Sequence, residues 1–136
     1  MFGPIIDTYT RAQAFADGVL VDIDSRPVSP TETGKELRED AGINLPIAMT
    51  PALLDAIKLR PDEIAAGKNL GDRLWDAFEM YKYIARGWAE RGRSCTVVEF
   101  PIETRRAPYE EVEAKAVASF DEHARPVLTL MLARED

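Results

Sequence analysis

The clearest pattern of apolar positions predicts one long helix between Asp72 and Trp88. Apolar side chains recur there at alternating steps of four and three residues, which places on one helical face Leu74, Phe78, Tyr81, Ala85 and Trp88. This apolar arc is widened by Trp75, Met80 and Tyr83. We therefore expect a helix that lies across a sheet and is covered on its flanks.

Capping signals predict three shorter helices in the first half of the chain. Thr10 with Gln13, and Thr33 with Glu36, have the spacing of capping boxes. The helix over 36–41 is brief and charged, so we expect it outside the core. Thr50 followed by proline starts a third helix, and the polar stretch 62–69 is expected to be a connection.

Alternating and β-branched segments predict the strands, which are Val19–Ile23, Cys95–Ile102, Val112–Phe120 and Val127–Ala133. The last two are expected to form a hairpin, although 110–118 is rich enough in Ala, Glu and Lys to be a helix. Leu45–Met49 contains Pro46 and would be at most an edge strand, and Pro101 likewise indicates an edge or a bulge.

These elements predict an α+β fold. An antiparallel sheet, built mainly from the C-terminal half, carries the 72–88 helix on one face, with smaller helices around it. The 136 residues suit a single globular domain, 1–136, and the segment 25–34 has the composition of a surface loop.

Composition narrows the class of protein. The chain is 46% apolar, and it shows no membrane-length apolar run and no secretory leader, so we expect a cytoplasmic protein without a membrane partner. Cys95 is the only cysteine and is expected to be buried. A single histidine gives no metal-ligand spacing, and there is no glycine fingerprint, so we expect no metal and no cofactor.

The net charge of -7 is unevenly distributed. Residues 82–106 carry three acidic side chains and six basic ones, which are Lys82, Arg86, Arg91, Arg93, Arg105 and Arg106. This section would suit a phosphate or an acidic partner, or it reflects a helix C-terminus and a solvated loop. Its aromatic neighbours Tyr83 and Trp88 would add a stacking surface for single-stranded nucleic acid or the anchor of a protein interface.

Asp22, Arg73 and Asp76 form a second candidate site if the end of a strand and the start of the long helix meet. An arginine between two carboxylates would bind a phosphate-bearing ligand only if one carboxylate turned away or held a metal; otherwise the three form structural ion pairs. His123, beside two acidic residues, is either a general base or an exposed turn residue.

Five stretches resemble a family of small bacterial proteins carried on plasmids and phages, with no assigned activity. They are 9–14, 16–22, 46–50, 71–76 and 125–132, and the most specific pieces are Ala-Asp-Gly-Val-Leu-Val-Asp (16–22) and Arg-Leu-Trp-Asp (73–76). Against that pattern the 25–34 loop is an insertion, and Ala124 stands in place of a glycine. The resemblance implies a mobile genetic element, where small acidic proteins often bind and block host machinery.

Three functions follow from these observations. The leading one is a non-enzymatic binding protein of a mobile element, an antagonist of host defence that uses either its acidic exterior or the region around Tyr83, Arg86 and Trp88. Its partner would be a host or mobile-element protein, and an open sheet edge would permit a homodimer. The alternatives are a nucleic-acid-binding accessory that uses 82–106, and a small enzyme with Asp22, Arg73, Asp76 or His123.

Overall fold

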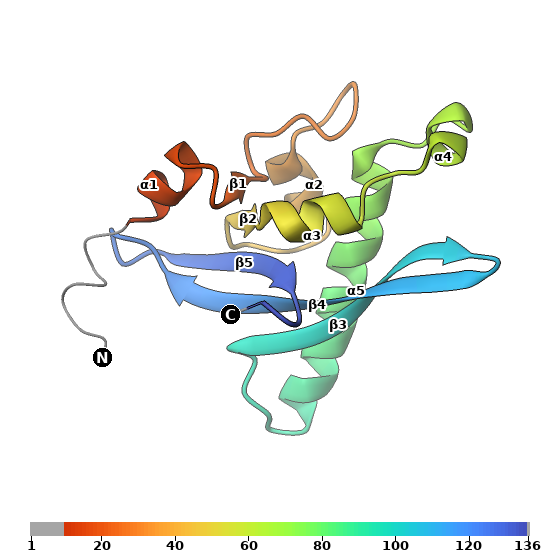
Figure 1. Ribbon diagram of the computed structural model, residues 1–136. Coiled ribbons are helices and arrows are strands. Elements are labelled where there is room, and N and C mark those ends of the chain that lie inside the picture. The colour runs from red at the N-terminus through yellow and green to blue at the C-terminus, as the bar shows by residue number, and fades with distance from the viewer. Residues whose placement is uncertain (1–9, 136) are drawn as a thin grey trace.

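A five-stranded sheet with one long helix across it forms the centre of the computed structural model, which describes residues 10–135 (Figure 1). The elements are α1 (Arg11–Ala16), β1 (Val21–Asp22), α2 (Gly34–Asp40), β2 (Ile47–Met49), α3 (Pro51–Ala56), α4 (Pro61–Ala65), α5 (Leu70–Glu90), β3 (Val97–Arg106), β4 (Tyr109–Phe120) and β5 (Pro126–Leu132). The strand order is β1-β2-β5-β4-β3, and only β2 and β5 run parallel. The predicted α+β fold is confirmed.

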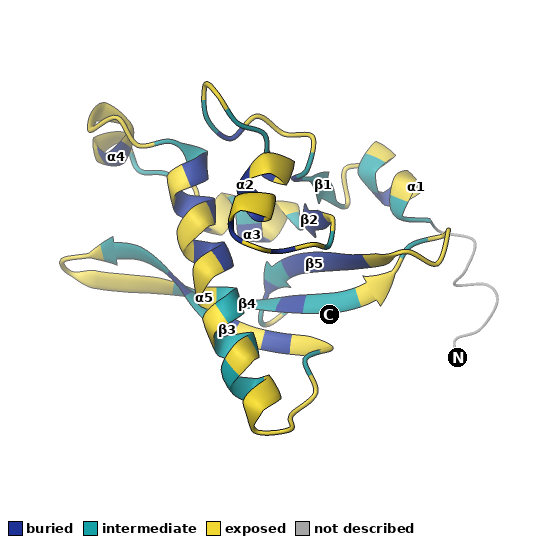
Figure 2. Ribbon diagram, turned by 180° about the vertical axis from the view of Figure 1, so that it is seen from behind, coloured by how far each residue is buried: buried dark blue, intermediate teal, exposed yellow. Residues whose placement is uncertain are grey.

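The long helix α5 begins with a reciprocal cap. The Asn69 side chain accepts a hydrogen bond from the Asp72 backbone N–H, and the Asp72 carboxylate accepts one from the Asn69 N–H. All of its buried residues lie between Gly71 and Phe78. Tyr81 then packs edge-on against Phe100 of β3, with ring centroids 5.8 Å apart. The second half of α5 extends past β3 at the sheet edge (Figures 1 and 2).

The expectation that the flanks of this helix are covered is wrong. Trp75, Met80 and Tyr83 are exposed, and Tyr83 retains 73% of its accessible surface. Among the described residues, the elements with substantial contacts to α5 are β3 on one side and α2 on the other. Because no further layer lies over the helix, its wide apolar arc is only partly used in packing.

The core forms where alternate residues of three strands face the helices. Val98, Phe100 and Ile102 of β3 are buried with Leu128 and Leu130 of β5. Between them β4 contributes the small residues Ala114 and Ala116, which are fully buried. The 110–118 segment is therefore a strand despite its helix-favouring composition, because it pairs with β3 on one side and β5 on the other.

Three local expectations from the sequence are wrong. The α2 helix is not outside the core, because Leu37 and Ala41 are buried against α5 and its neighbours. The stretch expected to be a polar connection contains α4, which Pro61 starts at its first position. Finally, β2 lies between β1 and β5 rather than at an edge, because Pro46 precedes the paired residues.

Other expectations about turns and edges agree with the structure. β3 is an edge strand, with an irregular register between Glu103 and Arg105. Ala124, in the β4–β5 turn, has a φ of 60°, a left-handed conformation that favours glycine. Cys95, just before β3, is half-buried instead of fully buried, and its Sγ donates to the Ala85 carbonyl oxygen at 3.4 Å.

The 25–34 loop is irregular but attached to the core. Val28 is buried, and its carbonyl oxygen accepts a hydrogen bond of 2.8 Å from the Gly71 N–H at the start of α5. A methyl group on Gly34 would lie 1.9 Å from the Ile23 carbonyl oxygen, so only glycine fits there. Among residues 10–135, no helix is long and apolar enough to cross a membrane.

Candidate functional site

A polar cavity of about 640 Å³ lies between α4, the start of α5 and the outer end of the β3–β4 hairpin. We call it the polar cavity. It is lined by equal numbers of basic and acidic side chains, which are Arg60, Lys68, Arg73, Arg105 and Arg106, and Asp62, Glu63, Asp72, Asp76 and Glu103. Because these charges balance, the cavity offers neither a cation nor an anion an excess of opposite charge.

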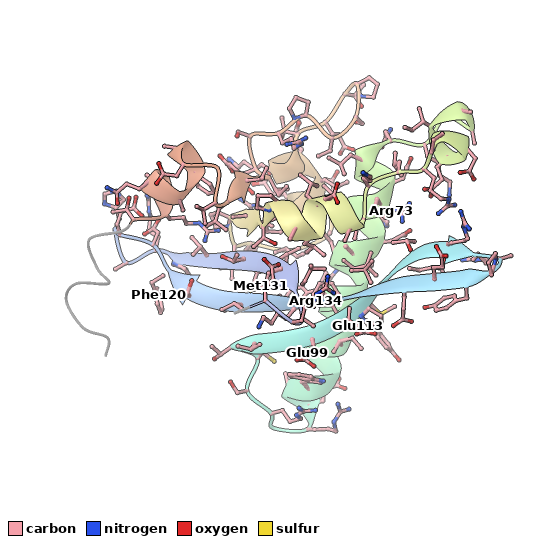
Figure 3. All side chains as sticks on the ribbon, in the orientation of Figure 1. Arg73, Glu99, Glu113, Phe120, Met131 and Arg134 are labelled. Carbon is pink, nitrogen blue, oxygen red and sulfur yellow. The ribbon has the colours of Figure 1, made fainter. Side chains whose placement is uncertain are left out.

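Glu63 and Arg73, which both line this cavity, form a buried ion pair; Figure 3 labels Arg73. The Arg73 Nη2 atom is 2.6 Å from both carboxylate oxygens, and the two side chains are only 4% and 9% exposed. Burial would raise the pKa of Glu63, but the Arg60 backbone N–H and the charges of Arg73 and Arg60 outweigh it and hold that pKa below its usual value. Glu63 is therefore ionised and fully paired.

The other arginines of the polar cavity also have partners within the protein. Arg60 donates from Nε to Asp62 at 3.2 Å and from Nη1 to the Thr104 carbonyl oxygen. Arg106 lies 3.4 Å from a Glu103 carboxylate oxygen. Glu63 is the only buried residue of α4, and Ile64 is 60% exposed. The contacts that hold α4 are therefore polar: the Glu63–Arg73 pair joins it to α5, and Arg60 joins it to the Thr104 carbonyl oxygen of β3.

Asp76 lies at the edge of the polar cavity, as predicted for a site with Arg73. Burial and the nearby Glu103 carboxylate raise the pKa of Asp76, and the opposing charges of Lys68 and Arg73 reduce that effect. The surroundings of Asp76 thus destabilise its ionised form, whereas those of Glu63 stabilise its ionised form.

Asp22 does not join this site. It belongs to β1, at the opposite edge of the sheet, and lines a separate cavity of about 530 Å³ with Arg11 and Asp121. Its carboxylate accepts a hydrogen bond of 2.9 Å from the Ser25 hydroxyl. His123 is exposed in the β4–β5 turn, where its backbone N–H donates to Asp121. The structure brings Arg73 and Asp76 together and separates Asp22 and His123 from them.

The last turns of α5 and the turn that follows bring together the other predicted residues. We call this region the arginine–aromatic end; it consists of Tyr83, Arg86, Trp88, Arg91 and Arg93. The Arg93 guanidinium lies over the Trp88 ring, 3.9 Å from its centroid, so Trp88 is half-buried while Tyr83 is exposed. Two hollows flank the helix here, one beside Tyr83 and Arg91 and one beside Trp88 and Arg93.

The arginines of the arginine–aromatic end differ from those of the polar cavity. None of the ion pairs within residues 10–135 includes Arg86, Arg91 or Arg93. The last turn of α5 contains no basic residue, so compensation of the helix dipole does not account for all three. They form a positively charged surface beside the exposed ring of Tyr83 and the half-buried ring of Trp88.

The predicted basic section from 82 to 106 does not form one surface. Lys82 pairs with Glu79 at 3.4 Å. Arg105 and Arg106 lie at the far end of β3, which at about 3.3 Å per residue is roughly 30 Å from its start. Within this section, only the arginines of the arginine–aromatic end remain available to bind a partner. The basic surface is therefore smaller than the sequence indicates.

An acidic surface lies beside this end, on the sheet face in front of α5 (Figure 3). Glu99, Glu111 and Glu113 are exposed there. A hydrogen bond with the Glu111 carboxyl raises the pKa of Glu113. Part of the acidic exterior expected from the net charge thus lies on β3 and β4.

Sequence reasoning missed Arg60 and Glu63 in the polar cavity, and Gly87 in the hollow beside Tyr83. The first two had a signal, because Arg60, Pro61 and Glu63 have the spacing of a capped helix start, and the Glu63 side chain does accept from the Arg60 N–H. Gly87 had none, because a glycine within a helical pattern does not show whether it faces solvent or a neighbour.

Comparison with known proteins adds no relative. No family model, curated protein or solved structure matches the chain. Within the described part of the chain, no group of three or more His, Cys, Asp or Glu side chains is placed to hold a metal ion.

Proposed function

We propose that this chain is a non-enzymatic binding protein that contacts an anionic macromolecule through its arginine–aromatic end. The expected partner is a host or mobile-element macromolecule, in keeping with the resemblance to a plasmid- and phage-borne family. The observation that carries the proposal is that Arg86, Arg91 and Arg93 have no ion-pair partner within the described residues, in a protein whose net charge is -7.

Two further features support this proposal. Arginine and aromatic side chains dominate the energetics of protein interfaces, and here they belong to the end of α5 and the turn after it, which project past the edge of the sheet (Figure 2). The polar cavity, by contrast, uses its arginines in internal contacts, and one of these, the Glu63–Arg73 pair, joins α4 to α5. A ligand entering it would have to compete with the Glu63–Arg73 pair.

The test is capture from a bacterial lysate by three forms of the tagged protein. These are the wild type, the variant R86E/R91E/R93E, and a control, R26E/K35E/R134E, which makes the same change in net charge at exposed positions elsewhere. We expect a partner retained by the wild type and the control and lost by the first variant. Retention by all three forms, or by none, would contradict the proposal.

A further inference from the structure

Gly87 leaves a gap in the row of side chains along one face of the arginine–aromatic end. Tyr83, Gly87 and Arg91 are four residues apart, so they follow one another along α5. They border a hollow of about 320 Å³ together with Ile84, Arg86 and Glu90. Above Gly87, an exposed phenol ring therefore stands on one side and a guanidinium group on the other.

The fold does not require glycine at this position. A methyl group on Gly87 would meet only the Arg91 Nη1 atom, at the ordinary contact distance of 3.6 Å. At Gly71 in the same helix, a methyl group would lie 3.0 Å from Asn69 Oδ1 and 3.4 Å from the Val28 carbonyl oxygen. Glycine destabilises a helix interior relative to alanine. Gly87 therefore places no side chain of its own between Tyr83 and Arg91, and the hollow there is bordered by the Arg91 guanidinium.

The groups around this space select a flat ligand with negative charge attached. A ring and a guanidinium on opposite sides suit a planar group stacked against Tyr83 and Arg91. Glu90 borders the hollow, and its carboxylate repels a phosphate but accepts the N–H groups of a base. Arg86 and Arg93, which have no ion-pair partner in the described part of the chain, are then left for phosphates.

Charge around the site limits the contact to a short, unpaired strand. The face of a base is available for stacking only when the base is not inside a duplex. Glu99 borders the hollow beside Trp88 and Arg93, and more acidic side chains lie beyond it on the sheet. A duplex would bring many phosphates toward this acidic surface, whereas a few nucleotides fit the three arginines.

We propose that the arginine–aromatic end binds single-stranded nucleic acid, with one base stacked above Gly87 between Tyr83 and Arg91 and its phosphates at Arg86 and Arg93. This inference rests on the proposed function, because it names the partner of the same surface. It predicts that affinity depends on bases as well as on phosphates.

The test measures fluorescence anisotropy of a labelled strand of about 12 nucleotides. The probes are the same sequence as DNA, as RNA and as a DNA duplex, and an abasic strand of equal length. We expect DNA, RNA or both to bind about tenfold more tightly than the duplex and the abasic strand. The two phosphate contacts, at Arg86 and Arg93, predict a slope of log K against log salt of about −1.4.

Two variants make the test specific for the gap. G87L fills the gap and should weaken binding of the intact strand about tenfold, with little change for the abasic strand; Y83A should do the same. A65L places the same side chain at an exposed position of α4, outside the arginine–aromatic end, and should leave binding unchanged. Circular dichroism checks that each variant keeps its helix.

Three results would overturn this inference: no binding of either single strand at low salt, equal affinity for the abasic strand, or wild-type affinity in G87L. If lysate capture still depends on Arg86, Arg91 and Arg93 and recovers a protein, the inference fails while the proposed function stands. If neither capture nor strand binding depends on these arginines, both fail.

Discussion

The polar cavity and the arginine–aromatic end both concentrate arginines, but the two regions use them in different ways. In the polar cavity Arg73 lies 2.6 Å from Glu63, and its arginine neighbours also have carboxylate partners. At the end of α5, Arg86 and Arg91 have no such partner among residues 10–135, and Arg93 covers Trp88. The comparison teaches that carboxylates within reach decide whether an arginine holds the fold together or remains available to a partner.

The largest expected effect comes from breaking the buried pair. E63Q should lower the free energy of unfolding by about 3 kcal/mol or more, because it leaves the Arg73 guanidinium buried without a counter-charge. R86E/R91E/R93E should change it by no more than about 0.5 kcal/mol, since these side chains are not buried. Urea unfolding measures both. Equal losses in the two variants would remove the distinction between the regions.

The effect of Glu63 should also depend on pH. Its pKa in the folded protein is lowered, so its contribution is fully present above the ordinary pKa of about 4.3 and is lost as the pH falls through the folded value. The difference in stability between wild type and E63Q should therefore narrow below about pH 4. A constant difference from pH 7 to pH 3 would show that the charge of Glu63 does not matter.

Replacing each of two glycines of α5 by alanine should change the stability by an intermediate amount, in opposite directions. G71A should destabilise the protein by about 1 kcal/mol, because its methyl group disturbs the Asn69 cap and the contact with Val28. G87A should stabilise it by up to about 1 kcal/mol, because the site is open and alanine favours the helix. The midpoints of thermal unfolding report both changes. A loss of stability in G87A would mean that Gly87 has a role in packing.

The smallest effect is expected at Asp76. Its pKa is raised by burial and by Glu103, so its charged form opposes folding. D76N should thus be slightly more stable than the wild type at pH 7, and the gain should disappear as the pH falls below the ordinary pKa of about 3.9. Unfolding in urea at the two pH values tests this. A gain in the stability of D76N that grew as the pH fell would contradict this prediction.

Much of the fold could be predicted from periodicity. The α5 helix and the β4–β5 hairpin follow from the spacing of apolar residues, and the Thr10 and Thr33 caps follow from local sequence. The exposure of the flanks of α5 could not be predicted, because an apolar pattern does not show how many layers cover a helix. The role of α2 was missed for a similar reason, since one buried leucine, Leu37, is enough to attach a charged helix.

The candidate sites were predictable in part. Tyr83, Arg86, Trp88, Arg91 and Arg93 are near one another in sequence and remain so in space, because they share a helix and its following turn. Asp22 and Arg73 were expected to meet because both lie at element ends, but an element end does not show which edge of the sheet it reaches. Likewise, the pairing of Arg73 with Glu63 depends on α4. The polar composition of 62–69 indicated a connection there and not a helix.

Hydrogen–deuterium exchange of the protein, free and bound to its captured partner, tests most directly whether the arginine–aromatic end is the binding surface. If it is, exchange should slow within residues 83–94 and stay unchanged in α4, at the start of α5 and at the outer end of the β3–β4 hairpin. Slowing around Arg60, Glu63 and Arg73, with no change in 83–94, would contradict the account and make the polar cavity the binding site.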